Sequence, residues 1–314
     1  MTDIASISIR EDSLIWSELT KNEKEITIHR AAFQTLPIFI HHQSIQKKSS
    51  ITQIATLLKQ IAQKRQFQNN KINLTFPGQF AIIKKIVLDE SISAEMQKDF
   101  ILYEFEKSWD ESSQNYSIFL PENQETANST REILAIAVRK TTLEFFEKIF
   151  NKAQLELETI TPSCFAIEEL FRLLFPNSSG QSLLLGWHRR GLEAIITDHK
   201  NFRDYYFRPY NSTLDLIENV TEFDLANGFS NLFFEIQQPR VLDQPRYDIQ
   251  TIYNFGYYFR PEWLDFMRSR IQIPSNLFNS DTSTSFQISL NDPQLSHEEI
   301  YKYIEAISSI SLFN

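Results

Sequence analysis

The segment Gly186-Trp187-His188-Arg189-Arg190-Gly191 has the glycine spacing of a phosphate-binding loop. Such a loop continues with Lys-Ser or Lys-Thr and opens a helix, because the lysine and the hydroxyl hold the phosphates and their metal. Here Leu192-Glu193 follows, and the segments on either side have strand-like sequences. The pattern therefore favours an ordinary hairpin turn over a phosphate site.

Cysteine and histidine give no catalytic or metal-binding pattern. Cys164 falls in the first turn of a predicted helix, where the helix dipole can lower a thiol pKa. No histidine is near it in sequence, so a small buried apolar side chain is the favoured interpretation. No pair of histidines has the spacing of a His-Glu-x-x-His zinc site, so we expect no catalytic residue and no metal. The six histidines are His29, His41, His42, His188, His199 and His297.

Composition excludes several classes of function. The 31 basic and 40 acidic side chains give a net charge of 31 − 40 = −9, which disfavours nucleic acid and anionic lipid as partners. A single cysteine allows no intrachain disulfide and fits a reducing cytoplasm. The start of the chain lacks a signal-peptide pattern, and no run reaches the roughly 18 apolar residues of a membrane span. We therefore expect a cytoplasmic protein.

Glycine is scarce, with six in 314 residues and none before Gly78. Loops that cradle phosphates need glycine where the backbone must approach an oxyanion closely. This chain has few places to build one, so ATP with Mg²⁺ is not expected as a cofactor.

The chain contains two modules of the same order: three strands, a helical region and a returning strand. Such a repeat indicates an internal duplication. The first has strands at 5–9, 14–20 and 25–29 around a polar turn at 10–13, a helix over 51–61 and a strand at 72–76. The second has strands at 183–185, 192–197 and 202–207, a helical region from the capping-box pattern Ser212-x-x-Asp215 to 238, a strand at 249–253 and a helix over 261–270.

A small α/β segment lies between the modules. Thr141-x-x-Glu144 predicts a capped helix through 152, and the strand at 157–160 leads to a helix with Thr161 as N-cap and Pro162 in its first position. The polar stretch 122–130 predicts a flexible loop. The other predicted elements are strands at 80–88, 116–120 and 132–138 and a helix over 94–109.

This organisation resembles the actin/Hsp70/FtsA superfamily, and within it the type IV pilus assembly protein PilM and its relatives. Their first hairpin has the form Gly-Leu-Asp-Ile-Gly-Ser-Ser-Ser-Ile-Lys-Leu-Val-Glu-Leu. The segment Ser6-Ile7-Ser8-Ile9-Arg10-Glu11-Asp12-Ser13-Leu14-Ile15-Trp16-Ser17-Glu18-Leu19 fits it without a gap. Phe76-Pro77-Gly78 and Tyr103-Glu104-Phe105-Glu106 resemble the entry into the family's inserted subdomain. Leu134–Arg139 with Leu155–Ala166 resembles the exit from it.

The resemblance implies an α/β fold with duplicated actin-like (ribonuclease H-like) lobes and a small α/β subdomain inserted in the first half. The first lobe is predicted at 1–78 and 156–180, the inserted subdomain at 79–155 and the second lobe at 181–314.

The nucleotide-binding residues of active relatives are not retained. Those relatives use an aspartate and a glycine in each of two hairpins, a glycine pair in a late loop and a further metal-side carboxylate. The corresponding positions here are Ser8, Arg10, Thr161, Trp187, Arg189 and Gly256. Serine and tryptophan remove carboxylate oxygens that hydrated Mg²⁺ needs, and arginine fills space that a phosphate would occupy. We therefore expect a pseudo-ATPase, an actin-like chain that does not hydrolyse ATP.

Arg10 and Arg189 are expected to face each other between the two hairpins. They could bind an anion there, or they could pair with carboxylates and latch the lobes, which is the favoured alternative. The aromatic run Phe255–Phe259 could close the former adenosine pocket.

The resemblance also implies a protein partner. PilM proteins hold the N-terminal cytoplasmic tail of a membrane protein, PilN, between the first lobe and its inserted subdomain. A scaffold of this kind would lie at the inner membrane through its partner. The residues predicted to contact the tail are Ile86, Leu88, Phe100, Tyr103, Phe105 and Trp109.

Two other functions stay open. One is an active actin-like ATPase or small-molecule kinase with rearranged nucleotide ligands, which Mg-ATP would stabilise. The other is an actin-like polymer-former that assembles without nucleotide. For helix 94–109, coverage of both faces by the fold is the simpler alternative to partner binding.

Overall fold

The computed structural model describes residues 2–65, 71–89, 91–107, 112–120, 125–127, 130–198, 201–210, 216–238, 247–279 and 286–310. Internal contacts divide the chain into two compact units. Unit 1 comprises Met1–Thr35, Phe67–Phe76 and Glu158–Asn314, and unit 2 comprises Leu36–Gln66 and Pro77–Leu157. The domain boundaries expected from the sequence stay a prediction.

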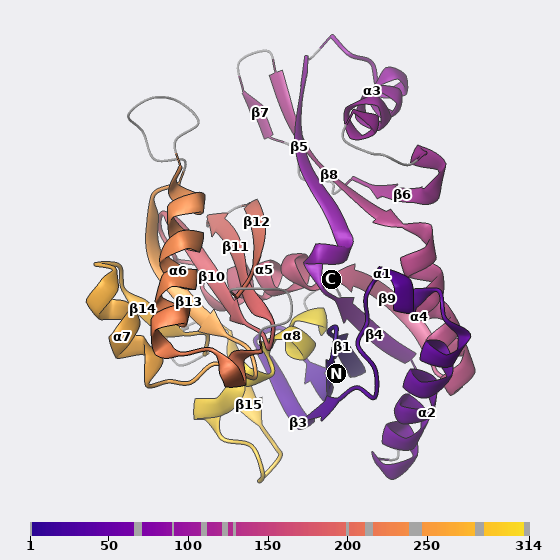
Figure 1. Ribbon diagram of the computed structural model, residues 1–314, viewed down its shortest axis with the longest axis vertical. Helices are drawn as coiled ribbons and strands as arrows, with labels where there is room; N and C mark the ends of the chain where they lie inside the picture. Colours follow the sequence, from indigo (N-terminus) through magenta and orange to yellow (C-terminus); the bar gives the residue numbers. More distant parts are fainter. Residues whose placement is uncertain are drawn as a thin grey trace. The chain divides into compact units, whose positions relative to one another are not determined.

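A six-stranded sheet forms the first lobe of unit 1 (Figure 1). Its strand order is β15-β3-β2-β1-β4-β9, in which β1 pairs antiparallel with β2 and parallel with β4. The amide of Arg10 donates to the carbonyl of Ser13 at 2.7 Å and closes the predicted first hairpin. The strands are β1 (Thr2–Ile9), β2 (Ser13–Lys21), β3 (Glu25–Thr35), β4 (Lys71–Phe76), β9 (Glu156–Pro162) and β15 (Gln287–Leu290).

A five-stranded sheet forms the second lobe and repeats this order as β12-β11-β10-β13-β14. The strand β10 pairs antiparallel with β11 and parallel with β13, as β1 does with β2 and β4. The predicted duplication is therefore confirmed. The strands are β10 (Gln181–Trp187), β11 (Gly191–Asp198), β12 (Phe202–Pro209), β13 (Ile249–Phe255) and β14 (Ser275–Leu277).

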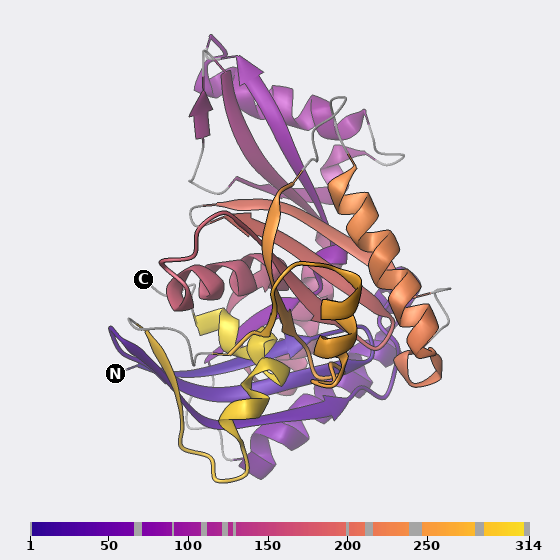
Figure 2. The same ribbon diagram turned by 90° about the vertical axis from the view of Figure 1, so that its left-hand side faces the viewer.

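Helices complete unit 1 (Figure 2). Helix α5 (Ser163–Leu174) contacts strands of both sheets, and the short α8 (Ile304–Ile307) packs on β1, β2 and α5. Helices α6 (Glu222–Gln237) and α7 (Trp263–Arg270) bury Phe229, Leu232 and Met267 against the second sheet. The 3₁₀ turns η3 (Ile217–Asn219), η4 (His297–Lys302) and η5 (Ser308–Ile310) complete this unit.

Unit 2 has its own core. In its small sheet, β8 pairs antiparallel with β5, β6 and β7, and helix α3 packs on β5. Helices α1, α2 and α4 pack against one another. The elements are α1 (His42–Ile45), α2 (Lys48–Arg65), η1 (Gly78–Phe80), β5 (Ala81–Asp89), α3 (Ala94–Glu106), η2 (Ser113–Asn115), β6 (Tyr116–Phe119), β7 (Glu125–Ala127), β8 (Thr130–Arg139) and α4 (Lys140–Ala153).

Two predicted helix caps are wrong. Helix α4 begins at Lys140, so Thr141 lies inside its first turn, and its N-cap Arg139 makes no side-chain cap. Strand β9 continues through Pro162, whose ψ of 130° is extended, so helix α5 begins at Ser163 and Thr161 is a strand residue. A β-branched threonine before proline favours extended backbone, which explains the second shift.

Some predictions lie outside the described residues. These are the capping-box pattern at 212–215, His199, Trp109 at the end of the predicted helix 94–109 and most of the loop 122–130. The observed helix α6 has a different capping box, formed by Thr221 and Asp224. Among the helices that the structure describes, none is long and apolar enough to cross a membrane.

Candidate functional site

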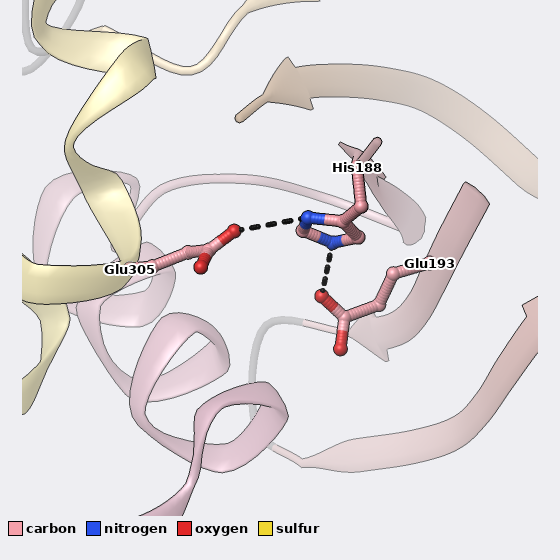
Figure 3. Close-up of side chains that lie close together, drawn as sticks. All are labelled: His188, Glu193 and Glu305. Atoms are coloured by element: carbon pink, nitrogen blue, oxygen red, sulfur yellow. Dashed lines mark hydrogen bonds and ion pairs between the residues drawn. The ribbon is translucent and has the colours of Figure 1, made fainter. Parts of the chain in front are cut away.

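Three parts of unit 1 meet at a buried cluster of charged side chains. The first hairpin supplies Arg10, and the second supplies His188 from its turn and Glu193 from β11. The C-terminal helix α8 supplies Glu305. In Figure 3 the imidazole of His188 lies between the two carboxylates. We call Arg10, His188, Glu193 and Glu305 the Arg10 cluster.

Arg10 binds both glutamates of the cluster. Its Nη2 donates to Oε2 of Glu193 at 2.6 Å, and its Nε donates to Oε2 of Glu305 at 2.6 Å. The three side chains are 7%, 0% and 2% exposed. One guanidinium therefore holds a carboxylate of β11 and a carboxylate of α8 through charge-assisted hydrogen bonds in a place with little water access.

His188 and Ser8 complete the contacts of the two carboxylates. Nε2 of His188 lies 2.8 Å from Oε2 of Glu193, and its Nδ1 lies 3.3 Å from Oε1 of Glu305. The hydroxyl of Ser8 donates to Oε2 of Glu305 at 3.2 Å. A proton on either imidazole nitrogen is thus directed at a carboxylate.

The pKa of Glu193 shows which effect dominates in the cluster. Burial by itself raises the pKa of this carboxyl, but the positive charge of Arg10 and the contact with His188 lower it to about 2. The two glutamates hold the pKa of the Arg10 guanidinium well above its ordinary value despite the opposing effect of burial. Glu193 and Arg10 are therefore an ion pair at all physiological pH values.

His188, Glu193 and Glu305 each offer an atom that could ligate a metal, within 4.8 Å of one another. Arg10 already neutralises the same carboxylates and contacts Oε2 of each. A divalent cation would place a second strong positive charge beside the guanidinium, so the donor set fits an arginine better than an ion. The expectation of no metal stays a prediction.

Arg189 links the two hairpins at a more exposed place. Its Nη1 lies 3.4 Å from Oδ2 of Asp12, which follows Arg10 in the first turn, and its Nε lies 2.8 Å from Oε1 of Glu218 in η3. Each arginine therefore has a carboxylate partner on the other hairpin, which is the pairing that the favoured alternative predicts.

The other positions predicted to correspond to nucleotide ligands lie within the fold, and the residue of the second hairpin that is equivalent to Ser8 is Gly186, not Trp187. Trp187 is buried, its Nε1 donates to Oδ1 of Asn254 at 3.0 Å, and its ring packs against Trp263 with centroids 5.0 Å apart. Gly256 has φ +111°, and an added Cβ would lie 2.6 Å from the carbonyl oxygen of Trp187. Thr161 is a partly buried residue of β9.

The aromatic run 255–259 is packed into the fold. Phe255 and Phe259 are buried, and Tyr257 stacks on Phe33 of β3 with centroids 3.7 Å apart. A hollow of about 300 Å³ remains beside the run. Its lining is Ile217, Glu218, Tyr257, Tyr258, Phe259, Arg260, Pro261, Glu262, Tyr301 and Lys302, so the Arg10 cluster is not part of it.

The turn of the second hairpin and the single cysteine both agree with the sequence predictions. The segment 188–190 is a hairpin turn between β10 and β11, where the amide of His188 donates to the carbonyl of Gly191 at 3.0 Å. Cys164 is fully buried, and burial raises the pKa of its thiol well above the ordinary value. The hairpin and the buried cysteine are therefore confirmed.

No protein-family model matches the chain, and no curated protein matches it. The solved structure of the PilM-PilN type IV pilus biogenesis complex matches with a TM-score of 0.77 and 11% identity, covering 99% of this chain and 98% of that chain. This chain has an actin-like fold similar to that of PilM.

Two further solved structures share the fold more distantly. The cytoplasmic domain of EpsL, an inner membrane component of the type II secretion system of Vibrio cholerae, has a TM-score of 0.53 and 7% identity, covering 99% of this chain and 95% of that one. The ethanolamine utilization protein EutJ from Carboxydothermus hydrogenoformans has a TM-score of 0.51 and 8% identity, covering 100% and 90%. At these identities the likeness is one of fold.

The residues predicted to contact a partner divide into two groups in unit 2. Ile86, Leu88 and Phe105 are at most 5% exposed and form the core between the small sheet and α3, with Phe100 packed against it. Tyr103 is 56% exposed on the outer face of α3, and Trp109 is not described. A partner on these elements would therefore contact alternate residues, such as Val87, which is 60% exposed on β5.

Proposed function

We propose that this chain is a non-catalytic actin-like scaffold that binds the cytoplasmic tail of a membrane protein in a pilus or type II secretion-like assembly. Its likeness to PilM, solved in a complex with PilN, and to the cytoplasmic domain of EpsL supports this assignment. The scaffold would lie at the inner membrane through its partner.

The contacts of Arg10 carry the non-catalytic part of the proposal. In an active relative this hairpin position leaves room for phosphate, and carboxylates near it hold hydrated Mg²⁺. Here the guanidinium occupies that position and binds the Oε2 atoms of Glu193 and Glu305. Opening the site for Mg-ATP would leave these buried charges without partners, which costs several kcal/mol.

The exposed edge of unit 2 offers a surface for a tail. Among the described residues, β5 pairs with β8 alone and is the last strand of its sheet. A free strand edge can accept an extended peptide through backbone hydrogen bonds, and side chains on alternate positions select the sequence. Val87 and Asp89 are the exposed alternate positions near the end of β5, so an apolar tail with a basic residue would fit.

A peptide titration tests tail binding. Fluorescent peptides with the N-terminal cytoplasmic tails of single-span membrane proteins encoded beside this gene are titrated with the full chain. We expect one tail to bind and Val87→Asp to weaken it at least tenfold. The control Phe119→Ser, at an exposed apolar residue on β6 at the opposite edge of the same sheet, should leave binding unchanged. Failure of every such tail to bind would reject the scaffold proposal.

Thermal unfolding with Mg-ATP separates this function from an ATPase or kinase. A ligand present at about 100 times its Kd stabilises the folded state by about 2.7 kcal/mol. We expect no shift of the melting temperature with millimolar Mg-ATP. A clear stabilisation, or release of phosphate that is lost in Glu193→Gln, would favour the enzyme.

A further inference from the structure

The outer face of helix α6 carries the two most exposed large apolar side chains among the residues that the structure describes. Phe223 is 68% exposed and Phe234 is 67% exposed. The opposite face of the same helix is anchored in the second lobe, where Leu225, Leu232 and Ile236 are at most 4% exposed. The two phenylalanines therefore contribute little to the core of the lobe.

The two phenylalanines lie on one side of the helix. They are eleven residues apart, which is three helical turns within about 20° of rotation and about 16 Å along the axis. Asn227, Ser230 and Asn231 are exposed between them on the same side. We call Phe223, Asn227, Ser230, Asn231 and Phe234 the α6 stripe.

Charge excludes several occupants of the α6 stripe. None of its five residues is charged, and α6 contains no lysine or arginine. On the flanks of the stripe, Asp224 caps the helix N-terminus and Glu235 pairs with Arg208 at 3.1 Å. Nucleic acid and anionic bilayers need positive charge, and basic proteins would find their counter-charges only beside the stripe.

The sequence of the stripe is nearly symmetric about its centre, between Gly228 and Phe229. Reversing the helix about this point exchanges Phe223 with Phe234 and Asn227 with Ser230. A two-fold axis through the centre would therefore place each phenylalanine against the other phenylalanine of a second copy. Such a self-complementary patch is what a symmetric dimer requires.

We propose that the α6 stripe is a homodimer interface, in which α6 of one chain packs antiparallel against α6 of a second copy. Phe223 of each chain contacts Phe234 of the other. The small polar residues Asn227 and Ser230 lie at the crossing point and let the helix axes approach to about 8–10 Å. The stripe itself is uncharged, and its nearest acidic neighbours, Glu222 of one chain and Glu235 of the other, lie opposite each other at the two ends of the interface.

The size of the stripe sets the strength of the dimer. Four phenylalanine side chains, each about two-thirds exposed, can bury on the order of 500 Å². Stable interfaces bury about 1,200–2,000 Å² in total, so the contact belongs with weak, concentration-dependent ones. We expect dimers at tens to hundreds of micromolar and monomers well below that range.

Sedimentation equilibrium of the full chain tests this interface. We expect a monomer–dimer equilibrium for the wild type and at least tenfold weaker association for the double variant Phe223→Ser, Phe234→Ser. The control Phe119→Ser, at a 48% exposed phenylalanine of unit 2, should associate like the wild type. A wild type that is monomeric at all concentrations, or a double variant that still dimerises, would overturn the proposal.

Disulfide trapping tests the antiparallel arrangement. Tagged Phe223→Cys chains are mixed with untagged Phe234→Cys chains, which leaves the second Phe223–Phe234 contact of each dimer intact. The native Cys164 is fully buried and does not compete. We expect cross-links between tagged and untagged chains. Cross-links mainly within one variant would overturn the antiparallel geometry, and tail binding at Val87 is unaffected by either result.

Discussion

Arg10 and Arg189 lie in the turns of the two duplicated hairpins, Arg10 at the first turn position and Arg189 at the second, and their surroundings differ. The side chain of Arg10 is 7% exposed and contacts two nearly inaccessible carboxylates. The side chain of Arg189 is 30% exposed, and its partners Asp12 and Glu218 are 12% and 46% exposed. One arginine therefore lies inside the protein, and the other lies at its surface.

The two arginines differ in the free energy of folding that is lost when a carboxylate partner is removed. Solvent screens an exposed ion pair and replaces its partners, so such a pair contributes about 0–1 kcal/mol. A buried charge without its partner has no water to replace it, and breaking such a pair costs about 3–5 kcal/mol. An arginine in the turn of each hairpin can thus contribute several kcal/mol in one half of a duplicated fold and little in the other.

The largest effect is expected from removing a carboxylate of the buried pair. Glu193→Ala leaves the guanidinium of Arg10 with one carboxylate fewer and should lower the free energy of unfolding by about 3–5 kcal/mol. Urea denaturation followed by tryptophan fluorescence measures this loss. The matched control Glu218→Ala removes a glutamate from Arg189 and should cost about 1 kcal/mol or less. Equal losses in the two variants would contradict the comparison.

Low pH should remove the contribution of the Arg10–Glu193 ion pair to the free energy of unfolding. The pKa of Glu193 is lowered from 4.5 to about 2 in the folded protein, so its contribution is present above pH 4.5 and is lost as pH falls toward 2. The shift corresponds to about 3 kcal/mol. The stability gap between wild type and Glu193→Gln should therefore narrow across this range in urea titrations at several pH values. A gap that stays constant would show that the charge of Glu193 does not stabilise the fold.

The late loop offers a test of backbone geometry. Gly256 has φ +111°, and Gly256→Ala would bring Cβ against the carbonyl oxygen of Trp187, so a loss of about 1–3 kcal/mol is expected. Gly228→Ala is the control, because an added Cβ there meets no atom within 4 Å and alanine favours a helix interior by about 1 kcal/mol. Thermal unfolding should shift in opposite directions for the two variants.

The smallest effect is expected at the exposed arginine. Arg189→Ala removes the contacts to Asp12 and Glu218 and should cost about 0.5–1 kcal/mol, and less at high salt. Urea denaturation at low and high ionic strength checks both statements. A decrease in the free energy of unfolding as large as that of Glu193→Ala would contradict the comparison between the buried and the exposed arginine.

The order of the strands was predicted from the sequence better than the ion pairs were. The two hairpins and the returning strands followed from local alternation and turn residues, such as the polar turn before Ser13. The pairing of Arg10 with carboxylates was also expected. Which carboxylates it would meet was not, because Glu193 is 183 and Glu305 is 295 residues away in sequence. Nothing local links residues so far apart.

The sequence did contain one indication of the two carboxylates that bind Arg10. Glu193 and Glu305 are single acidic residues within apolar segments, and a charge in such a segment needs a buried partner. The residues predicted to contact a partner on β5 and α3 were apolar, but the sequence did not show which of them face the core. Residues on adjacent positions of a strand face opposite sides, so Leu88 is buried while Val87 is exposed, and composition alone does not tell which side is covered.

The path of the last described residues has a consequence for synthesis. Strand β15 pairs in parallel with β3, and α8 contacts β1 and β2, so the first lobe is completed by residues 287–307. The hydroxyl of Ser6 donates to the carbonyl of Ala306, 300 residues later. During translation the N-terminal sheet keeps one edge and one face uncovered until residues 287–307 have been synthesised and can pack on it.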